Sequence, residues 1–279
     1  FPWPFADFCV FLFCKNKKII LNYHSDIIKQ KFLKYFYIKF FKIFINSKII
    51  NCINVSSEKY FESSDLKKII KKNKYLINFQ KMGYEDLSNI HIPLESIRNE
   101  IKVFFNQNKK IILFFGRNRH YKGLDVIEYI ISNNKNKNFL ISCNNLMLHK
   151  KYKSNRNILL LDGLNYFEKL YVLKKSYLNL FPSLNRAESL GLTLIECQMF
   201  GLPSLVFEIN SGTSLIIKDN ETGIIVKNID FDEYNKKLNN LYFDETLRNS
   251  LSEKSRSNYL DNFSVKKFDN YAKNLLAKH

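Results

Sequence analysis

Short apolar runs alternate with longer amphipathic segments along the whole chain. Apolar runs between polar turns predict buried strands, whereas an apolar stripe every three to four residues predicts a helix. The pattern predicts strands over Lys18–Asn22, Ile49–Val55, Tyr75–Phe79, Ile111–Phe115, Asn138–Ser142, Asn157–Leu161, Tyr177–Phe181, Pro203–Phe207 and Gly223–Val226. It also predicts helices such as Gly123–Ile131, Tyr166–Lys174 and Thr193–Phe200. This alternation indicates an α/β protein whose parallel sheets are covered by helices on both faces.

A polar segment between Met82 and Lys110 divides the chain into two parts. We interpret 83–108 as a linker between a first domain over 1–82 and a second domain over 109–279. The second part holds six of the predicted strands and is long enough for a complete domain. The first part holds three, and the chain begins with Phe1 inside an apolar run. We therefore expect the first domain to be incomplete, with its N-terminal half missing.

The composition excludes disordered and low-complexity proteins, since 46% of the residues are hydrophobic and 25% are charged. A formal net charge of +18 is compatible with a polyanionic partner such as nucleic acid, anionic lipid or a phosphorylated ligand. Only seven of the 44 basic residues are arginine, and lysine is frequent everywhere, so compositional bias explains most of this charge. The five cysteines form no C-x-x-C motif, which argues against a disulfide framework or a zinc site. No apolar run reaches the length of a transmembrane helix.

The segment Lys31–Ile45 predicts an amphipathic helix with a basic stripe, because its lysines fall on one side and its other face is aromatic and aliphatic. One interpretation is attachment to an anionic membrane surface. The alternative is a helix that covers the sheet and exposes its lysines to water, as any sheet of this type requires.

A basic turn follows the buried strand in Ile111–Gly123, IILFFGRNRHYKG. Ligands of open α/β sheets bind at the carboxyl ends of the strands, and Gly116 allows a close approach of the backbone there. Arg117 offers a planar fork for phosphate oxygens and Lys122 a mobile point charge, next to the N-terminus of the following helix. The alternative is a solvated basic loop. The spacing matches neither a Walker loop nor G-x-G-x-x-G.

Two glutamates follow the strand Tyr177–Phe181, Glu188 in a loop and Glu196 inside the next helix. Carboxylates are strong acceptors for vicinal hydroxyls, so each is a candidate for a different hydroxyl partner. Gly191 precedes the helix, and the backbone N–H groups around it are expected to face a ligand. The spacing Thr193-x-x-Glu196 also fits a capping box, which would give Glu196 a structural role. The residues alone leave both interpretations open.

Together and in this order, G-R-x₄-K-G, F-P-S, E-x₇-E and G-x-P resemble the GT-B retaining glycosyltransferases of family GT4, from Ile111 to about Val226. The resemblance implies two Rossmann-like domains that face each other across a cleft, with the last helix returning toward the first. It also implies donor-binding roles: the diphosphate for Arg117 and Lys122, the ribose for Glu196, a catalytic position near the transferred sugar for Glu188, and backbone contacts to sugar and phosphate for Ser189, Leu190, Gly191 and Leu192.

The first part of the chain resembles the GT4 mannosyltransferases of bacterial O-antigen and capsule assembly, through F-P-W-P-F-A-D and L-N-Y-H-S-D. This implies that His24 lines the catalytic cleft near the donor sugar; the alternative is a capping or packing histidine. S-G-T-S at 211–214 departs mildly from the family pattern. The Gly-rich loop of the first domain is not in this sequence, which puts the activity of the chain on its own in doubt.

The resemblance implies a hexosyltransferase that moves a sugar, mannose favoured, from a GDP-sugar or UDP-sugar to a glycan or lipid-linked glycan acceptor in cell-surface polysaccharide such as lipopolysaccharide. No cofactor or metal is expected, in line with the lack of a D-x-D motif in a strand-end loop. We expect a cytoplasmic protein, with peripheral contact to the inner face of the cytoplasmic membrane through 31–45. The alternatives are a UDP-sugar-dependent GT4 enzyme, a GT-B epimerase, an inactive fragment and a basic nucleic-acid-binding protein. No nucleic-acid-binding module is recognisable.

Overall fold

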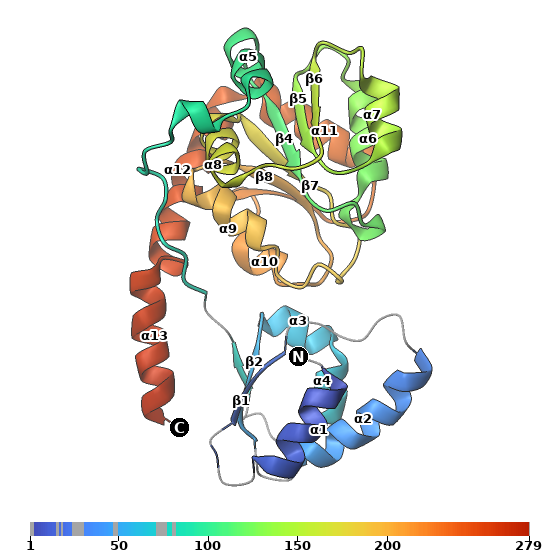
Figure 1. Cartoon of the computed structure of the whole chain (residues 1–279), viewed down its shortest axis with the longest axis vertical. Coiled ribbons are helices and arrows are strands. Elements are labelled where there is room, and N and C mark those ends of the chain that lie inside the picture. The colour runs from blue at the N-terminus through green and yellow to red at the C-terminus, as the bar shows by residue number, and fades with distance from the viewer. Residues whose placement is uncertain are drawn as a thin grey trace.

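The computed structural model of the chain describes residues 3–14, 17, 19–23, 31–46, 50–70, 77–79 and 82–278. These residues form two α/β units, which lie one above the other in Figure 1. Every predicted strand is present, and its ends lie within two residues of the predicted ones. All strand pairs within the two sheets are parallel, which confirms the predicted α/β class.

The first unit is the lower one in Figure 1, and its described residues form a parallel sheet in the order β1-β2-β3. Its elements are α1 (Pro4–Phe13), β1 (Ile19–Tyr23), α2 (Lys31–Asn46), β2 (Ile50–Val55), α3 (Glu58–Ser63), α4 (Asp65–Ile69) and β3 (Ile77–Phe79). Helix α2 buries Tyr37, Phe41 and Phe44 in a core shared with β1 and β2. The hydroxyl of Tyr37 donates to the buried carboxylate of Asp7 on α1 at 2.8 Å, which ties the two helices together.

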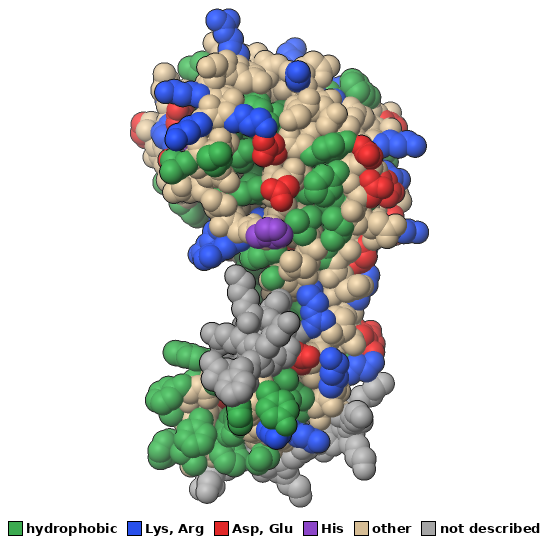
Figure 2. All heavy atoms as spheres, turned by 90° about the vertical axis from the view of Figure 1, so that its right-hand side faces the viewer, with side chains coloured by type: hydrophobic (Ala, Val, Ile, Leu, Met, Phe, Trp, Pro, Cys, Tyr) green, Lys and Arg blue, Asp and Glu red, His purple; other side chains and the backbone are tan. Residues whose placement is uncertain are grey.

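The outer sides of α1 and α2 expose large apolar side chains, which Figure 2 shows as a gathering of hydrophobic groups on the lower unit. The exposed residues are Trp3, Phe5, Phe8, Leu12, Phe13, Tyr35, Phe36 and Ile43, and we call this set the exposed apolar face. Lys39 and Lys42 are exposed on the same helix as Tyr35, and the Nζ of Lys39 lies 4.3 Å from the centroid of the Tyr35 ring. Helix α2 therefore both covers the sheet and presents aromatic and basic groups to the outside.

A row of asparagine side chains crosses the first sheet. Asn22, Asn54 and Asn78 occupy matching positions on β1, β2 and β3. The Nδ2 of Asn54 donates to Asn22 at 2.9 Å, and the Nδ2 of Asn78 donates to Asn54 at 3.0 Å. Asn78 also bonds the hydroxyl of Tyr271 on α13 (Val265–Lys278), which runs down beside the first sheet in Figure 1. The asparagine row therefore fixes the strand register and fastens the last helix to β3.

The second unit contains a six-stranded parallel sheet in the order β6-β5-β4-β7-β8-β9. Its strands are β4 (Ile112–Phe115), β5 (Phe139–Ser142), β6 (Ile158–Leu161), β7 (Leu178–Phe181), β8 (Ser204–Phe207) and β9 (Gly223–Val226). Its helices are α5 (Asn99–Gln107), α6 (Leu124–Asn133), α7 (Leu146–Tyr152), α8 (Tyr166–Lys175), α9 (Leu192–Met199), α10 (Thr213–Ile216), α11 (Phe231–Phe243) and α12 (Glu245–Asn262).

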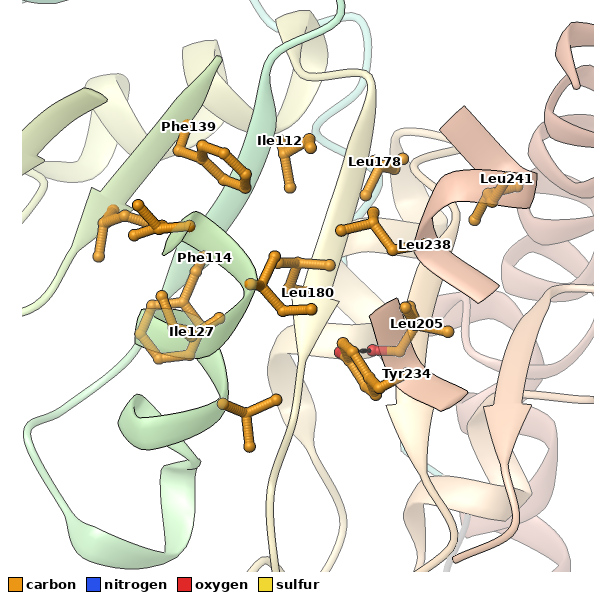
Figure 3. Close-up of a cluster of buried hydrophobic side chains, with 14 of the residues drawn as sticks. Ile112, Phe114, Ile127, Phe139, Leu178, Leu180, Leu205, Tyr234, Leu238 and Leu241 are labelled. Carbon is orange, nitrogen blue, oxygen red and sulfur yellow. Dashed lines mark hydrogen bonds between the residues drawn. The ribbon is translucent and has the colours of Figure 1, made fainter. Parts of the chain in front are cut away.

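Side chains of the second sheet alternate between two buried layers, as strand geometry requires. Ile112 and Phe114 point into the layer beneath α6 and α11, whereas Leu113 between them joins α5 and α8 on the opposite face. Figure 3 shows the first of these layers, in which the hydroxyl of Tyr234 donates to the carbonyl oxygen of Leu205 at 2.7 Å. Burial on both faces explains why these strands read as continuous apolar runs.

The segment predicted as a linker, 83–108, packs on the second unit. Tyr84 exchanges backbone hydrogen bonds with Phe263 and Val265 around the end of α12. The Arg98 guanidinium is bound to Glu168 on α8, and α5 buries Ile101 and Phe104 in the core beneath the sheet. Any change in the angle between the two units therefore has to occur before Tyr84 and along α13, where the chain passes from one unit to the other.

Candidate functional site

The strand order of the second sheet creates a crevice between β4 and β7. The chain runs outward from β4 to β5 and β6 on one side, and then returns to β7, β8 and β9 on the other side. Ligands of open parallel sheets bind at such a reversal, outside the carboxyl ends of the strands. The loops that follow β4 and β7 are 116–123 and 182–191, and they contain Arg117, Lys122 and Glu188. The backbone N–H of Leu184 donates to the carbonyl oxygen of Tyr121 at 2.8 Å, which joins the two loops.

Gly123 lets the two loops come together. Its φ is +71°, a left-handed conformation that side chains other than glycine rarely adopt. A Cβ atom at this position would also clash with the carbonyl oxygen of Pro182, directly after β7. The same residue is the N-cap of α6, so the N-terminus of this helix opens onto the crevice. An anion bound there would meet the positive end of the helix dipole.

Lys122 and Glu188 meet in an ion pair across the crevice, with only 15% and 12% of their side chains exposed. The Nζ of Lys122 also lies 5.0 Å from the centroid of the Phe181 ring. Glu188 accepts a second hydrogen bond on the same oxygen, Oε2, from the hydroxyl of Ser183 at 3.4 Å. Among the described residues, none donates to Glu188 Oε1. The pair therefore brings together the residue predicted for the phosphate and the residue predicted for the sugar.

Arg117 is exposed at the mouth of a hollow of about 380 Å³ at the carboxyl ends of β4, β5 and β6. Its guanidinium forms no hydrogen bond or ion pair with any residue in the described ranges. The polar part of the lining comes from Arg117, Asn118, Ser142, Asn144, Asp162 and Lys169. A charged, planar group without a partner beside a polar hollow is suited to hold a phosphate or another anion.

Glu196 lies on α9 and pairs with Lys169 of α8, with 2.7 Å between the Nζ and Oε1 atoms. The capping box predicted for Thr193 and Glu196 is wrong. Helix α9 begins at Leu192 with Gly191 as its N-cap, at φ +81°, and no side chain caps it. The helix therefore starts two residues earlier than the spacing of Thr193 and Glu196 suggested. Gly191 can serve as the N-cap because glycine adopts this left-handed conformation without strain. Glu196 is thereby free of the structural role that the sequence allowed for it.

The loop 188–192 presents unpaired backbone donors. In the described part of the chain, no acceptor takes a hydrogen bond from the N–H groups of Ser189, Leu190, Gly191 or Leu192. The carbonyl oxygen of Ser189 is occupied, because it accepts from the N–H of Gly212 at 2.8 Å. The carbonyl side of the loop is thus anchored to the segment after β8, while its amide side is available to a ligand.

Sequence reasoning missed the lysine that joins the two parts of the site. Lys169 lines the hollow with Arg117 and pairs with Glu196, but it is one lysine among many and lies in an ordinary helical pattern. Asn144 and Asp162 follow β5 and β6, so the rule that placed Arg117 at a strand end applied to them too. His24 lies outside the described residues, and its predicted role in the cleft stays a prediction.

Metal-binding groups and membrane-spanning helices are both absent from the described residues. Within the described ranges, no group of three or more His, Cys, Asp and Glu side chains is arranged to hold a metal ion. Metal independence stays a prediction. In the same ranges, no helix combines the length and the apolar character that crossing a membrane requires.

Two α/β units with parallel sheets, one of them carrying a basic crevice at its strand reversal, match the GT-B fold of solved glycosyltransferases such as WaaG, with a TM-score of 0.66. A sequence profile of the family described as "Glycosyl transferases group 1" matches residues 96–258, which is more than half of the chain. The chain therefore belongs to this family, which confirms the resemblance read from the motifs.

Three similar proteins illustrate the relationship. The D-rhamnosyltransferase WbpZ of Pseudomonas aeruginosa is 31% identical over 232 residues, 81% of this chain and 58% of that protein. The O-antigen chain mannosyltransferase C of Escherichia coli is 26% identical over 269 residues, 95% of this chain and 70% of that protein. The structure of HepE of Anabaena in complex with UDP superposes with a TM-score of 0.75 at 12% identity, over 98% of this chain and 75% of that chain. The chain thus spans just under three fifths of the length of the rhamnosyltransferase.

Proposed function

We propose that the protein transfers a hexosyl group, mannose favoured, from a nucleotide-diphosphate donor to a hydroxyl of a glycan or lipid-linked glycan, with retention at the anomeric carbon. The observation that carries the proposal is the Lys122–Glu188 pair at the crevice between β4 and β7, with Arg117 of the same loop as Lys122 at the adjoining hollow. The names of the rhamnosyl- and mannosyltransferase relatives support a role in the synthesis of cell-surface polysaccharide such as O-antigen.

The main chemical demand of this reaction is to stabilise the charge that develops on the leaving diphosphate. Lys122 and Arg117 supply positive charge, and the N-terminus of α6 and the amides of 189–192 supply hydrogen-bond donors. Lys122 is held in place before any donor binds, by Glu188 and by the Phe181 ring. Such preorganisation lowers the cost of arranging the site around the charged leaving group.

The carboxylates take the hydroxyl groups of the donor in this proposal. Glu188, whose Oε1 has no donor among the described residues, accepts from the transferred sugar. Glu196 accepts from the ribose of the nucleotide, with Lys169 holding its other side toward the hollow. The donor is a GDP-sugar or a UDP-sugar, and competition between GDP-mannose and UDP-sugars for binding to the protein identifies which.

The exposed apolar face is the part of the protein that would bind the membrane in this proposal. Aromatic side chains together with the exposed Lys39 and Lys42 form a surface suited to the headgroup region of an anionic bilayer. A lipid-linked acceptor would be reached from such a position, on the inner face of the cytoplasmic membrane. Co-sedimentation with vesicles that contain or lack anionic lipid tests this part by itself.

Nucleotide titration of two variants tests the donor site. Arg117→Ala and Lys122→Ala should each weaken GDP or UDP binding by roughly 1.5–3 kcal/mol, the contribution of one hydrogen bond to a charged group. Nucleoside binding should change little, because the lost contacts involve the diphosphate. Arg156→Ala is the matched control, since Arg156 is exposed in the loop before β6 and far along the chain from both site loops. Unchanged affinity for GDP and UDP in both site variants would contradict the proposal.

A further inference from the structure

Helix α3 of the first unit contacts the site loops of the second unit at two points. The helix follows β2 directly, at the carboxyl end of the first sheet. The loops that it meets are 182–191 after β7 and 208–212 after β8. The carboxyl edges of the two sheets therefore face each other through this one short helix.

The first contact point is Arg186, two residues before Glu188. Its Nη1 donates to the carbonyl oxygen of Ser63, the last residue of α3, and its guanidinium lies 5.6 Å from the centroid of the Tyr60 ring. A cation at a helix C-terminus interacts favourably with the helix dipole. The charge of Arg186 also reaches Tyr23 at the end of β1: burial raises the pKa of this tyrosine, and the nearby guanidinium opposes that rise.

The second contact point lies one strand further along. Lys59 on α3 pairs with Glu208 directly after β8, and the hydroxyl of Ser63 donates to the carbonyl oxygen of Asn210 at 3.3 Å. The two loops are themselves joined through Ser189, whose carbonyl oxygen accepts from Gly212. The hydroxyl of Ser56, just before α3, donates to that same oxygen at 3.4 Å.

We propose that Arg186 is a positioning residue that couples the approach of the two units to the shape of the donor site. Tyr121 and Gly212 hold the loop 182–191 near its two ends, and α3 holds its middle when it engages Arg186, so that Glu188 and the amides of 189–192 face the crevice together. When α3 withdraws, the loop loses its outer support. The part of this inference that concerns the donor rests on the proposed function, whereas the contact between Arg186 and α3 does not.

Hydrogen–deuterium exchange measured on the chain tests the contact without nucleotide. Arg186→Ala should raise the exchange rates of residues 57–64 and 183–191 by about tenfold or more, because a hydrogen bond from a charged group is lost. Strands β4 and β7 should keep their protection. Arg186→Lys should give a smaller increase, because lysine keeps the charge but not the planar fork. Arg156→Ala should change neither segment.

A charge exchange tests the second contact point. Lys59→Glu should also raise exchange in 57–64, by placing two carboxylates together, and the double variant Lys59→Glu with Glu208→Lys should restore protection. Exchange rates of 57–64 and 183–191 that are unchanged in Arg186→Ala overturn the proposal, whatever the charge exchange gives.

Addition of GDP tests the coupling. In the wild-type chain, GDP should slow exchange in both 116–123 and 57–64, although no residue of α3 has a place in the proposed donor site. In Arg186→Ala, GDP should still protect 116–123 but no longer 57–64. Protection of 57–64 by GDP that persists in Arg186→Ala overturns the proposed coupling. A wild-type chain that neither GDP nor UDP protects anywhere contradicts the donor site instead, and the measurement without nucleotide then still decides the Arg186 contact.

Discussion

The carboxylates of Glu168 and Glu188 each pair with a cation in the second unit, but their oxygen atoms are satisfied to different degrees. Glu168 is almost fully buried and accepts four hydrogen bonds: from the backbone N–H and Nε of Arg98 on Oε1, and from Nη2 of Arg98 and the backbone N–H of Asn165 on Oε2. Glu188 uses a single oxygen for both Lys122 and Ser183.

The difference distinguishes a structural carboxylate from one suited to binding. Glu168 closes a capping box with Asn165 at the start of α8 and fastens the segment before α5 to the sheet. It has no acceptor capacity left for a ligand. Glu188 lies on a loop, keeps one oxygen without a donor in the described ranges, and directly precedes the unpaired amides of 189–192. The two carboxylates thus differ in how many of their acceptor positions are already filled by hydrogen bonds.

The largest expected effect is the loss of stability in Glu168→Ala. The variant removes four accepted hydrogen bonds and leaves the Arg98 guanidinium only its contacts with Gly163 and Glu100, which should lower the free energy of unfolding by about 3 kcal/mol. Urea denaturation measures it. Glu188→Ala is the comparison variant and should lose less, about 1–2 kcal/mol, because it removes two accepted hydrogen bonds instead of four. Equal losses in the two variants would remove the distinction between the two carboxylates.

Acid should destabilise the protein through the saturated carboxylates. Burial raises the pKa of Glu168, but the hydrogen bonds from Arg98 and from backbone N–H groups outweigh it, and the net pKa lies below the ordinary 4.5. Hydrogen bonds from Arg256 likewise lower the pKa of Asp86 to about 2. A lowered folded-state pKa means that this stabilisation is complete above the unfolded pKa and is lost as the pH falls through the folded value.

The melting temperature should therefore fall as the pH drops from about 5 toward 2. In Glu168→Gln and in Asp86→Asn the fall should be shallower, because each variant lacks one of the titrating groups. Thermal melts at a series of pH values measure this. A wild-type acid slope retained in both variants would show that other carboxylates control the transition.

Glu188→Gln should separate binding from turnover. The nucleotide affinity should stay within about twofold of wild type, since the proposed partner of Glu188 is the sugar, while turnover should fall roughly tenfold or more. Titration with GDP and a transfer assay give the two numbers. A loss of GDP affinity with unchanged turnover would move Glu188 to the nucleotide side of the site.

The smallest effects are expected at Glu196. Its pair with Lys169 is partly exposed, so Glu196→Gln should change the free energy of unfolding by less than about 1 kcal/mol. GDP affinity should fall by about fivefold, because a neutral amide is a weaker acceptor for ribose hydroxyls. Lys169→Ala provides the matched comparison. Lower stability with wild-type affinity would assign the pair to the packing of α8 on α9.

The strands could be predicted because burial on both faces leaves uninterrupted apolar runs, such as Ile111–Phe115, between polar turns. Arg117, Lys122 and Glu188 could be found because strand ends are the binding edge of a parallel sheet. The start of α9 could not, since Thr193 and Glu196 had the spacing of a capping box while a left-handed Gly191 provided the N-cap. The true capping box at Asn165 and Glu168 carried the same readable spacing.

Contacts between distant segments carry no local signal. Nothing in the residues around Lys169 marks it as the partner of Glu196, and nothing near Arg186 points to α3. Both depend on how helices and loops far apart in sequence come together, and a single lysine or arginine in a basic protein does not reveal its partner. The polar composition of 83–108 could likewise be seen in the sequence, but its packing against α12 and α8 could not be predicted from it.

The attachment of α13 to β3 affects the order in which the protein can mature. Among the described strands, β3 pairs only with β2, and its outer side meets α13 through Tyr271, whose hydroxyl also lies 3.5 Å from the carbonyl oxygen of Phe79. Because α13 leaves the ribosome after both sheets, the contact of Tyr271 with this border strand can form only late in synthesis. Exposed edge strands can pair with strands of other chains and thereby cause aggregation. A nascent chain stalled before Val265 is therefore the form most exposed to aggregation and most dependent on chaperones.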